Sequence, residues 1–70
     1  MTDICAPMSG NIWKILVKEG DQVKADDELL VMEAMKMEIP VTAEADGVIK
    51  EIKVREGDPV EAEAVLAVLE

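Results

Sequence analysis

The chain contains the same sequence unit twice, and this repeat constrains the fold more than any other feature. When residues 10–33 are laid over residues 47–70, an offset of 37 (47 minus 10), 12 of the 24 aligned positions are identical without a gap. The same register extends backwards, where Ala6 meets Ala43 and Ile4 meets Val41. Two units are too few for a solenoid, which normally needs at least about three. The repeat therefore predicts two related halves packed face to face within a single domain spanning residues 1–70.

The duplication leaves a short joint between the halves. Residues 1–33 match residues 38–70, so four residues (70 minus 33 minus 33) have no counterpart. The unmatched residues are Ala34, Met35, Lys36 and Met37, which lie in the strip Glu33-Ala34-Met35-Lys36-Met37-Glu38. A lysine between two methionines, bordered by acidic residues, is either a solvated side chain or an amine presented for chemistry.

Each half predicts short β-strands and no helix. Residues 11–17, 28–33, 39–43, 48–54 and 65–70 are rich in strand-forming residues, and Gly-Asp pairs mark turns between them. Within the first strand of each half, apolar residues fall at 12, 15, 17 and at 49, 52, 54, so alternation breaks once at matching places. A β-bulge explains such a break, because one extra residue resets which side chains face inward. We therefore predict an all-β fold of two small sheets related by a pseudo-twofold axis.

The joint predicts a hairpin with unusual turn residues. Tight hairpin turns prefer Asn-Gly, Asp-Gly or Gly-X at the centre, whereas this one offers Met35 and Lys36. A local rule broken in an otherwise consistent sequence is a candidate for function. The alternative is that Met35 and Met37 are core residues that fill gaps.

A lysine at a hairpin tip is a suitable attachment handle, because its amine lies on a long flexible stem. An ordinary lysine amine is almost entirely protonated at neutral pH, and nothing in this sequence would remove Lys36 from water. Acylation of Lys36 would therefore need a second enzyme that supplies an activated acyl group. The chain is thus predicted to be a carrier and a substrate, with no catalytic residues of its own.

Composition excludes several other functions. The formal net charge is −9, which disfavours nucleic acid and anionic membrane surfaces as partners. No apolar run is long enough to span a membrane, and no signal peptide is visible, so we expect a cytoplasmic protein. With one cysteine and no histidine, neither an internal disulfide nor a zinc site is expected.

Cysteine, glycine and tryptophan residues are expected to have structural or surface roles. Cys5 is expected to be a structural thiol, and the four glycines are expected to serve turns or bulges. Trp13 corresponds to Lys50 in the repeat, so we expect its side chain to face outward, where it could meet a partner.

Several motifs together resemble the biotinyl domains of the biotin/lipoyl attachment family. The strip Glu33–Glu38 is similar to their biotin-attachment motif, and Ala6-Pro7-Met8-Ser9-Gly10 is similar to their opening Ala-Pro-Met-x-Gly. Residues 18–23 and 45–49 also fall in the usual places, so the resemblance covers essentially the whole chain. The related lipoyl domains carry Asp-Lys-Ala at the same hairpin, so the methionines favour biotin over lipoate.

The resemblance implies a specific fold and function. The fold would be a flattened barrel-like sandwich of two four-stranded antiparallel sheets, monomeric as an isolated domain. Lys36 would be joined to biotin by a biotin protein ligase, with Met35, Met37, Ala34 and Glu33 serving recognition and positioning. The biotin would carry carboxyl groups between a biotin carboxylase site and a carboxyltransferase site. The alternative implied by the family is covalent lipoate on the same lysine.

Two features depart from the larger members of the family. The segment Glu19–Leu29 leaves no room for the protruding loop of some bacterial carrier domains, and no Ala/Pro-rich linker is present. We therefore expect either a small free-standing attachment protein or a C-terminal domain of a larger one.

Overall fold

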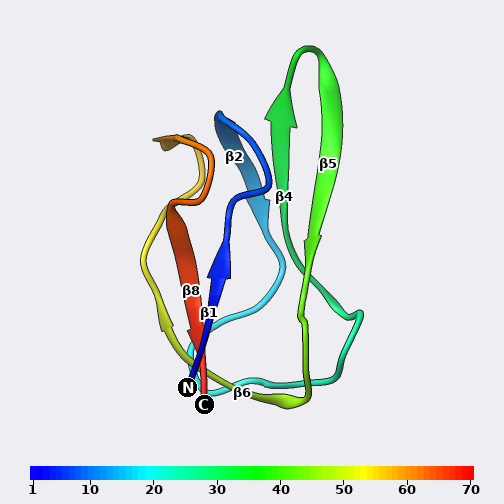
Figure 1. The fold of residues 1–70 in the computed structure, drawn as a ribbon, viewed down its shortest axis with the longest axis vertical. Helices are drawn as coiled ribbons and strands as arrows, with labels where there is room; N and C mark the ends of the chain where they lie inside the picture. The colour runs from blue at the N-terminus through cyan, green and yellow to red at the C-terminus, as the bar shows by residue number, and fades with distance from the viewer.

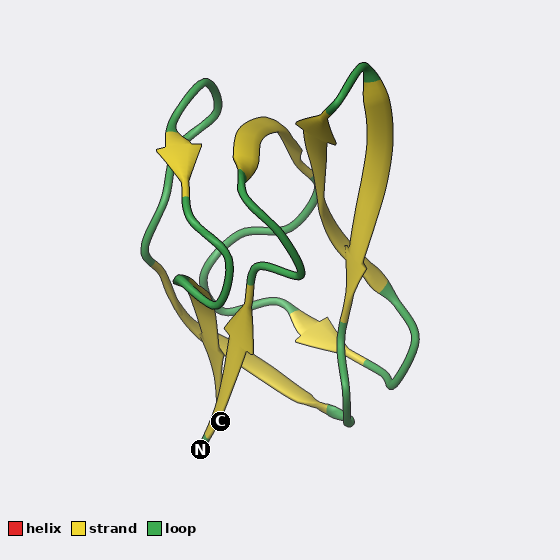
Figure 2. Cartoon of the chain, turned by 45° about the horizontal axis from the view of Figure 1, so that its top comes forward, coloured by secondary structure: helices red, strands yellow, loops and turns green.

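A computed structural model describes all 70 residues. The chain forms eight β-strands joined by loops and turns, and it contains no helix (Figures 1 and 2). Two four-stranded antiparallel sheets form, with strand orders β1-β8-β6-β3 and β5-β4-β2-β7, and the all-β two-sheet prediction is confirmed. We call the first the terminal sheet and the second the hairpin sheet. The strands are β1 (Thr2–Cys5), β2 (Gly10–Ile15), β3 (Gln22–Val23), β4 (Glu28–Ala34), β5 (Met37–Thr42), β6 (Gly47–Ile52), β7 (Pro59–Val60) and β8 (Val65–Leu69).

The pseudo-twofold relation is visible in the strand orders. Under the offset of 37 residues, β1, β2, β3 and β4 correspond to β5, β6, β7 and β8, and this exchange converts one sheet order into the other. The two halves are nevertheless not packed face to face as separate units, and that expectation is wrong. Each sheet takes two strands from each half, because β1 pairs with β8 and β7 pairs with β2. The halves are interleaved, so neither sheet can form from one half alone.

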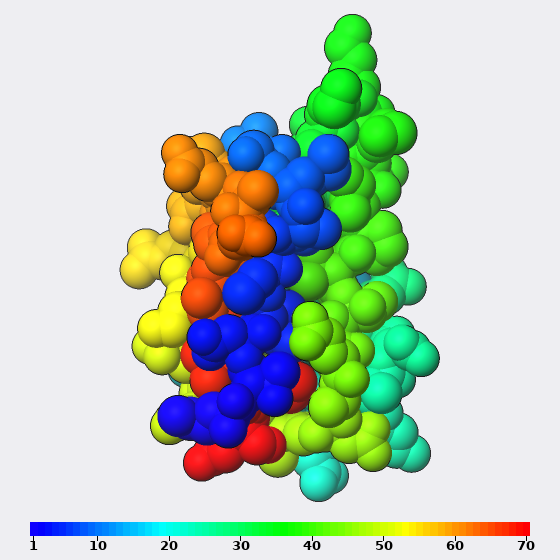
Figure 3. Space-filling model, in the orientation of Figure 1, coloured from blue at the N-terminus to red at the C-terminus, as the bar shows by residue number.

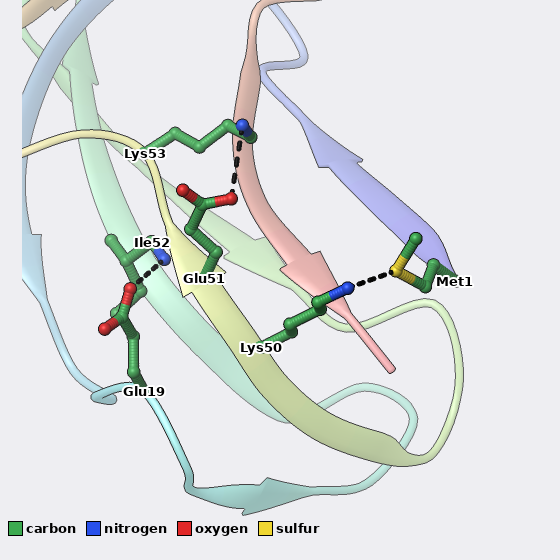
Figure 4. A network of polar contacts seen from close by, with 6 residues as sticks. All are labelled: Met1, Glu19, Lys50, Glu51, Ile52 and Lys53. Atoms are coloured by element: carbon green, nitrogen blue, oxygen red, sulfur yellow. Dashed lines mark hydrogen bonds and ion pairs between the residues drawn. The ribbon is translucent and has the colours of Figure 1, made fainter.

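The predicted bulge is present in both β2 and β6, at matching positions. The register of β2 against β4 shifts between Ile12 and Lys14, and that of β6 against β8 shifts between Ile49 and Glu51. Just beyond each bulge, a glutamate from the other half accepts a hydrogen bond from a strand amide. Glu56 Oε2 lies 3.0 Å from the Ile15 nitrogen, and Glu19 Oε2 lies 3.1 Å from the Ile52 nitrogen (Figure 4). The repeated Lys/Arg-Glu-Gly-Asp segments therefore connect the halves as well as turning the chain.

The core between the sheets is aliphatic. The most deeply buried large side chains come from both halves and both sheets, and no polar or charged residue is buried. They are Ile4, Ile12, Leu29, Leu30, Met32, Ile49 and Leu66. Burial of these side chains is the main stabilising contribution available to a chain of this size.

The long hairpin of β4 and β5 and the two chain termini lie at opposite ends of the molecule. In Figure 1 the termini lie together at the bottom, and the hairpin rises at the top. The space-filling view shows the hairpin tip extending beyond the rest of the body (Figure 3). The fold therefore holds this tip away from the termini and open to approach from several sides.

None of the secondary-structure elements is a helix that could cross a membrane.

Candidate functional site

The unmatched joint forms the tip of the hairpin, as predicted. The β4–β5 ladder runs from Glu28 opposite Thr42 to the closing pair Ala34 and Met37. Met35 and Lys36 form a two-residue turn, with φ angles of 52° and 65°. Positive φ at both central residues is typical of a type I′ turn, which matches the twist of the flanking strands. The ladder thus fixes Lys36 at the outermost point of the hairpin.

This turn places two side chains in a backbone conformation that they disfavour. The left-handed region costs an ordinary residue roughly 1–2 kcal/mol, which is why Gly or Asn usually occupies such turns. The other positive-φ residues occur in corresponding pairs, Gly20 with Gly57 and Asp26 with Glu63. The strain at Met35 and Lys36 has no counterpart in the other half and is confined to the hairpin tip. Strain of this kind concentrates at functional sites.

The methionines that flank Lys36 lie in solvent. Met35 is 81% exposed and Met37 is 56% exposed, so the alternative that they are core residues is wrong. The core methionine is instead Met32 on β4, which is fully buried. Lys36 is also exposed, and its amine has no hydrogen-bond or ion-pair partner. The tip therefore presents a free amine between two apolar side chains.

Ala34 and Glu33 hold the base of the hairpin. Ala34 is only 5% exposed and faces the interior, so it can position the turn but offers little surface to a partner. Glu33 is exposed on the opposite face of β4. The five predicted site residues are consecutive, but the structure separates them into an exposed group, Glu33 and Met35–Met37, and one buried spacer.

Gly10 belongs to the site, although the sequence assigned it only to a turn or bulge. It begins β2, and an added Cβ would lie 2.6 Å from the Glu33 carbonyl oxygen and 2.9 Å from Ala34 Cβ. Gly47 makes the corresponding close approach to the Glu70 carbonyl oxygen, at 2.8 Å. Gly20 and Gly57, by contrast, have positive φ and do serve turns. One sequence signal pointed to this role: glycine is kept at both equivalent positions of the repeat, Gly10 and Gly47, and so is glutamate at Glu33 and Glu70.

The chemistry of the tip is that of an acceptor. No histidine exists in the chain, and no cluster of three or more His, Cys, Asp or Glu side chains is arranged to hold a metal ion. A general base must lie within hydrogen-bond reach of the proton it removes, and the Lys36 amine has no such partner. The tip thus presents an amine that an activated acyl group could reach.

Comparison with known proteins places this geometry in a family. Residues 2–69 match the Biotin_lipoyl family model, described as "Biotin-requiring enzyme". A biotin/lipoyl attachment protein of Bacillus subtilis is 49% identical over 41 residues, which cover 59% of this chain and 56% of that protein. A biotin-dependent acyl-coenzyme A carboxylase alpha3 subunit of Mycobacterium leprae is 51% identical over 45 residues, covering 64% of this chain and 8% of that protein. The chain thus spans about half the length of the first relative and a small part of the second.

Solved structures show the same fold. The urea carboxylase of Kluyveromyces lactis matches with a TM-score of 0.94 and 35% identity, covering 99% of this chain and 6% of that one. The lipoyl domain of the 2-oxoglutarate dehydrogenase complex of Azotobacter vinelandii matches with a TM-score of 0.84 and 37% identity. It covers 100% of this chain and 96% of that domain, which fits a flattened barrel-sandwich.

Proposed function

The chain belongs to the biotin/lipoyl family, and from this premise we propose that Lys36 carries covalently attached biotin and that the chain is a biotin carboxyl carrier domain. The observation that carries the proposal is the hairpin tip. It presents an unpartnered amine on a strained turn between two exposed methionines, in a fold shared with a carboxylase.

Attachment requires an activating enzyme, because the chain offers no base or acyl donor. A biotin protein ligase would first join the biotin carboxyl group to the AMP part of ATP, breaking the bond between the α and β phosphates and releasing pyrophosphate. The deprotonated Lys36 Nζ would then attack that carboxyl carbon, forming an amide bond, while AMP leaves and the amine's proton passes to the ligase or to water. The chain's own contribution is to hold Lys36 at the outermost point of a rigid hairpin.

The fold alone does not choose between biotin and lipoate, since a lipoyl domain shares it. Biotin is favoured because the carboxylase subunit of Mycobacterium leprae, which matches 64% of this chain, is described as biotin-dependent. The Met-Lys-Met tip favours the same group. Lipoate on Lys36 is therefore not the function we propose.

Attached biotin supplies the chemistry of carrying a carboxyl group, and the chain supplies its reach. Tethering replaces diffusion by a high effective concentration at each partner's site. Because the tip and the termini lie at opposite ends (Figure 1), connections through the termini would leave Lys36 free to visit two sites. The partners we propose are a biotin carboxylase and a carboxyltransferase.

Two parallel modification reactions test the choice of group. The chain is incubated with a biotin protein ligase, ATP and biotin, or with a lipoate ligase, ATP and lipoate, and its intact mass is measured. We expect quantitative addition of one biotinyl group in the first reaction and little or no addition in the second. Lipoylation that is as fast and complete as biotinylation would overturn the preference for biotin.

Replacing Met35 by asparagine should separate stability from acceptance. Asparagine tolerates the left-handed conformation, so the free energy of unfolding should rise by about 1 kcal/mol, measured by urea denaturation. Removing an exposed apolar side chain next to Lys36 should at the same time slow biotinylation. Biotinylation of Met35→Asn at the wild-type rate would show that Met35 has no role in recognition.

A further inference from the structure

Away from the hairpin tip, a group of apolar side chains lies uncovered on the outer face of the hairpin sheet. Trp13 and Leu16 are 45% and 51% exposed. Val31 on β4 is half-buried, and Pro40, which pairs with it on β5, is exposed. We call these four residues, Trp13, Leu16, Val31 and Pro40, the Trp13 surface.

The strand register brings Val31 and Pro40 together with Lys14, the neighbour of Trp13, and Leu16 follows directly after β2. Lys14 opposes Val31, and Val31 opposes Pro40, so the outer face carries one row across β2, β4 and β5. The bulge in β2 sets Trp13 beside Lys14, whose Nζ lies 4.9 Å from the centre of the indole ring. A cation–π contact of this length helps to fix the ring in place. Trp13 is therefore a solvent-accessible aromatic side chain whose orientation is restricted by Lys14.

The terminal sheet provides an internal comparison, because it has the same backbone at corresponding positions. There, Lys50, Glu51 and Lys53 stand where the hairpin sheet has Trp13, Lys14 and Leu16. Figure 4 shows them forming polar contacts: Lys53 Nζ lies 3.3 Å from Glu51 Oε1, and Lys50 Nζ lies 3.0 Å from Met1 Sδ. The corresponding backbone positions therefore accept charged side chains in the terminal sheet.

The valine at the centre of each outer face also differs in its burial. Val68 on β8 corresponds to Val31 and is buried, at 8% exposure, whereas Val31 is only half-buried. At the compared positions, the outer face of the terminal sheet thus carries charged side chains that contact one another or Met1. The outer face of the hairpin sheet carries exposed apolar side chains there. Apolar patches rimmed by polar residues are typical of protein–protein contact sites.

The charges around the Trp13 surface limit what can cover it. Glu33 and Glu38 oppose each other in the next row toward the hairpin tip, and Glu28 lies on β4 in the other direction. A second copy of this chain, with a net charge of −9, would be repelled, and so would nucleic acid or an anionic membrane. A protein surface that combines an apolar cleft with basic side chains is complementary to this face.

The position of the surface favours one such protein. Val31 lies five residues before Lys36 along β4, which is roughly 16 Å of extended strand. One side of a standard interface covers about 800 Å², a disc of roughly 16 Å radius. An enzyme that modifies the bare Lys36 must come within reach of its short stem, whereas a carboxylase meets an arm lengthened by biotin. The enzyme that attaches biotin is thus the one required to lie close against this sheet.

We propose that the Trp13 surface is a docking site for the biotin protein ligase, which holds the domain while its active site engages Lys36. This inference rests on the proposed function. The ligase contact would include Trp13 and Leu16 as apolar anchors, with Glu33 and Glu38 facing basic residues of the ligase.

The terminal sheet supplies the variant that tests the proposal. Trp13→Lys with Leu16→Lys gives the hairpin sheet the side chains already tolerated at positions 50 and 53. It changes the net charge from −9 to −7, so the matched control is Asp3→Asn with Glu44→Gln, which makes the same change on the terminal sheet and in the loop after β5. Circular dichroism establishes that both variants are folded.

Steady-state biotinylation with purified ligase, biotin and ATP is then measured against domain concentration. We expect the Trp13/Leu16 variant to lose roughly tenfold in kcat/KM, almost entirely through a higher KM, as for loss of interface anchors. The control should stay within about twofold of wild type, the effect expected of distant surface charges. A wild-type KM for the Trp13/Leu16 variant, or a loss confined to kcat, would overturn the docking role.

A second measurement uses the wild-type sequence and does not depend on the variant folding. Trp13 is the only tryptophan, so biosynthetic labelling with 5-fluorotryptophan gives a single ¹⁹F resonance. Unlabelled ligase should shift or broaden this resonance in proportion to complex formed. An unchanged resonance under conditions where Lys36 is being biotinylated would overturn the proposal while leaving the proposed function intact. Failure of the wild type to accept biotin would instead overturn the proposed function.

Discussion

Replacing Lys36 with arginine is expected to abolish attachment of biotin completely, with no change in the fold. Arginine keeps the positive charge and the long stem, but its guanidinium does not form the amide bond that the ligase makes. Because Lys36 is exposed and has no hydrogen-bond or ion-pair partner, no stabilising contact is lost. Intact mass after exhaustive reaction with ligase, biotin and ATP should show only the unmodified chain.

The matched control for this variant is Lys18→Arg. Lys18 is an exposed lysine in a turn, and the repeat already has Arg55 at the corresponding position. This variant should accept one biotinyl group as fast as the wild type. If Lys36→Arg still gained a biotinyl group, the acceptor would be a different lysine, and the hairpin tip would lose its assigned role.

Replacing Gly10 with alanine is expected to damage both the fold and the site. The added Cβ would meet the Glu33 carbonyl oxygen at 2.6 Å, and a backbone atom in a paired strand cannot move aside as a flexible side chain can. Overpacking of this kind costs roughly 2 kcal/mol of stability, a large fraction for a domain this small. Relief of the clash would push β4 away from β2 at the base of the hairpin, and thereby displace Lys36.

The corresponding Gly47→Ala variant separates these two effects. Its Cβ would make a similar close approach, 2.8 Å from the Glu70 carbonyl oxygen, at the end of the molecule that holds the termini. Urea denaturation should show both variants destabilised. Biotinylation at a temperature where both are folded should be slowed only by Gly10→Ala. Equal rates for the two variants would mean that Gly10 supports the fold without positioning the hairpin.

The repeat explains why much of this fold could be predicted from sequence. An internal alignment gives each strand a second example, so the bulges near Ile12 and Ile49 stood out as a matched break in alternation. The same alignment identified the hairpin joint, because those residues alone had no counterpart. It also predicted that Trp13 faces outward, since its partner in the repeat is a lysine, and the structure confirms this.

The interleaving of the halves was not predictable in the same way. A repeat reveals which segments are equivalent, but equivalent segments can pair within a half or between halves with equal sequence evidence. The pairing of β1 with β8 depends on the three-dimensional path of the chain. The role of Gly10 was missed because its close neighbours, Glu33 and Ala34, are distant in sequence, and the matching pairs Gly10/Gly47 and Glu33/Glu70 do not by themselves reveal a contact. By contrast, the sequence already showed that Met35 and Lys36 are unusual turn residues, and the structure adds their positive φ angles.

The most direct test of the account is to locate the attached group on the wild-type chain. After reaction with ligase, biotin and ATP, the chain is digested and its peptides are fragmented by tandem mass spectrometry. The account predicts one biotinyl group per chain, on Lys36 and on no other lysine. A biotinyl group on any of the other five lysines, Lys14, Lys18, Lys24, Lys50 or Lys53, or no biotin on Lys36 at all, would contradict it.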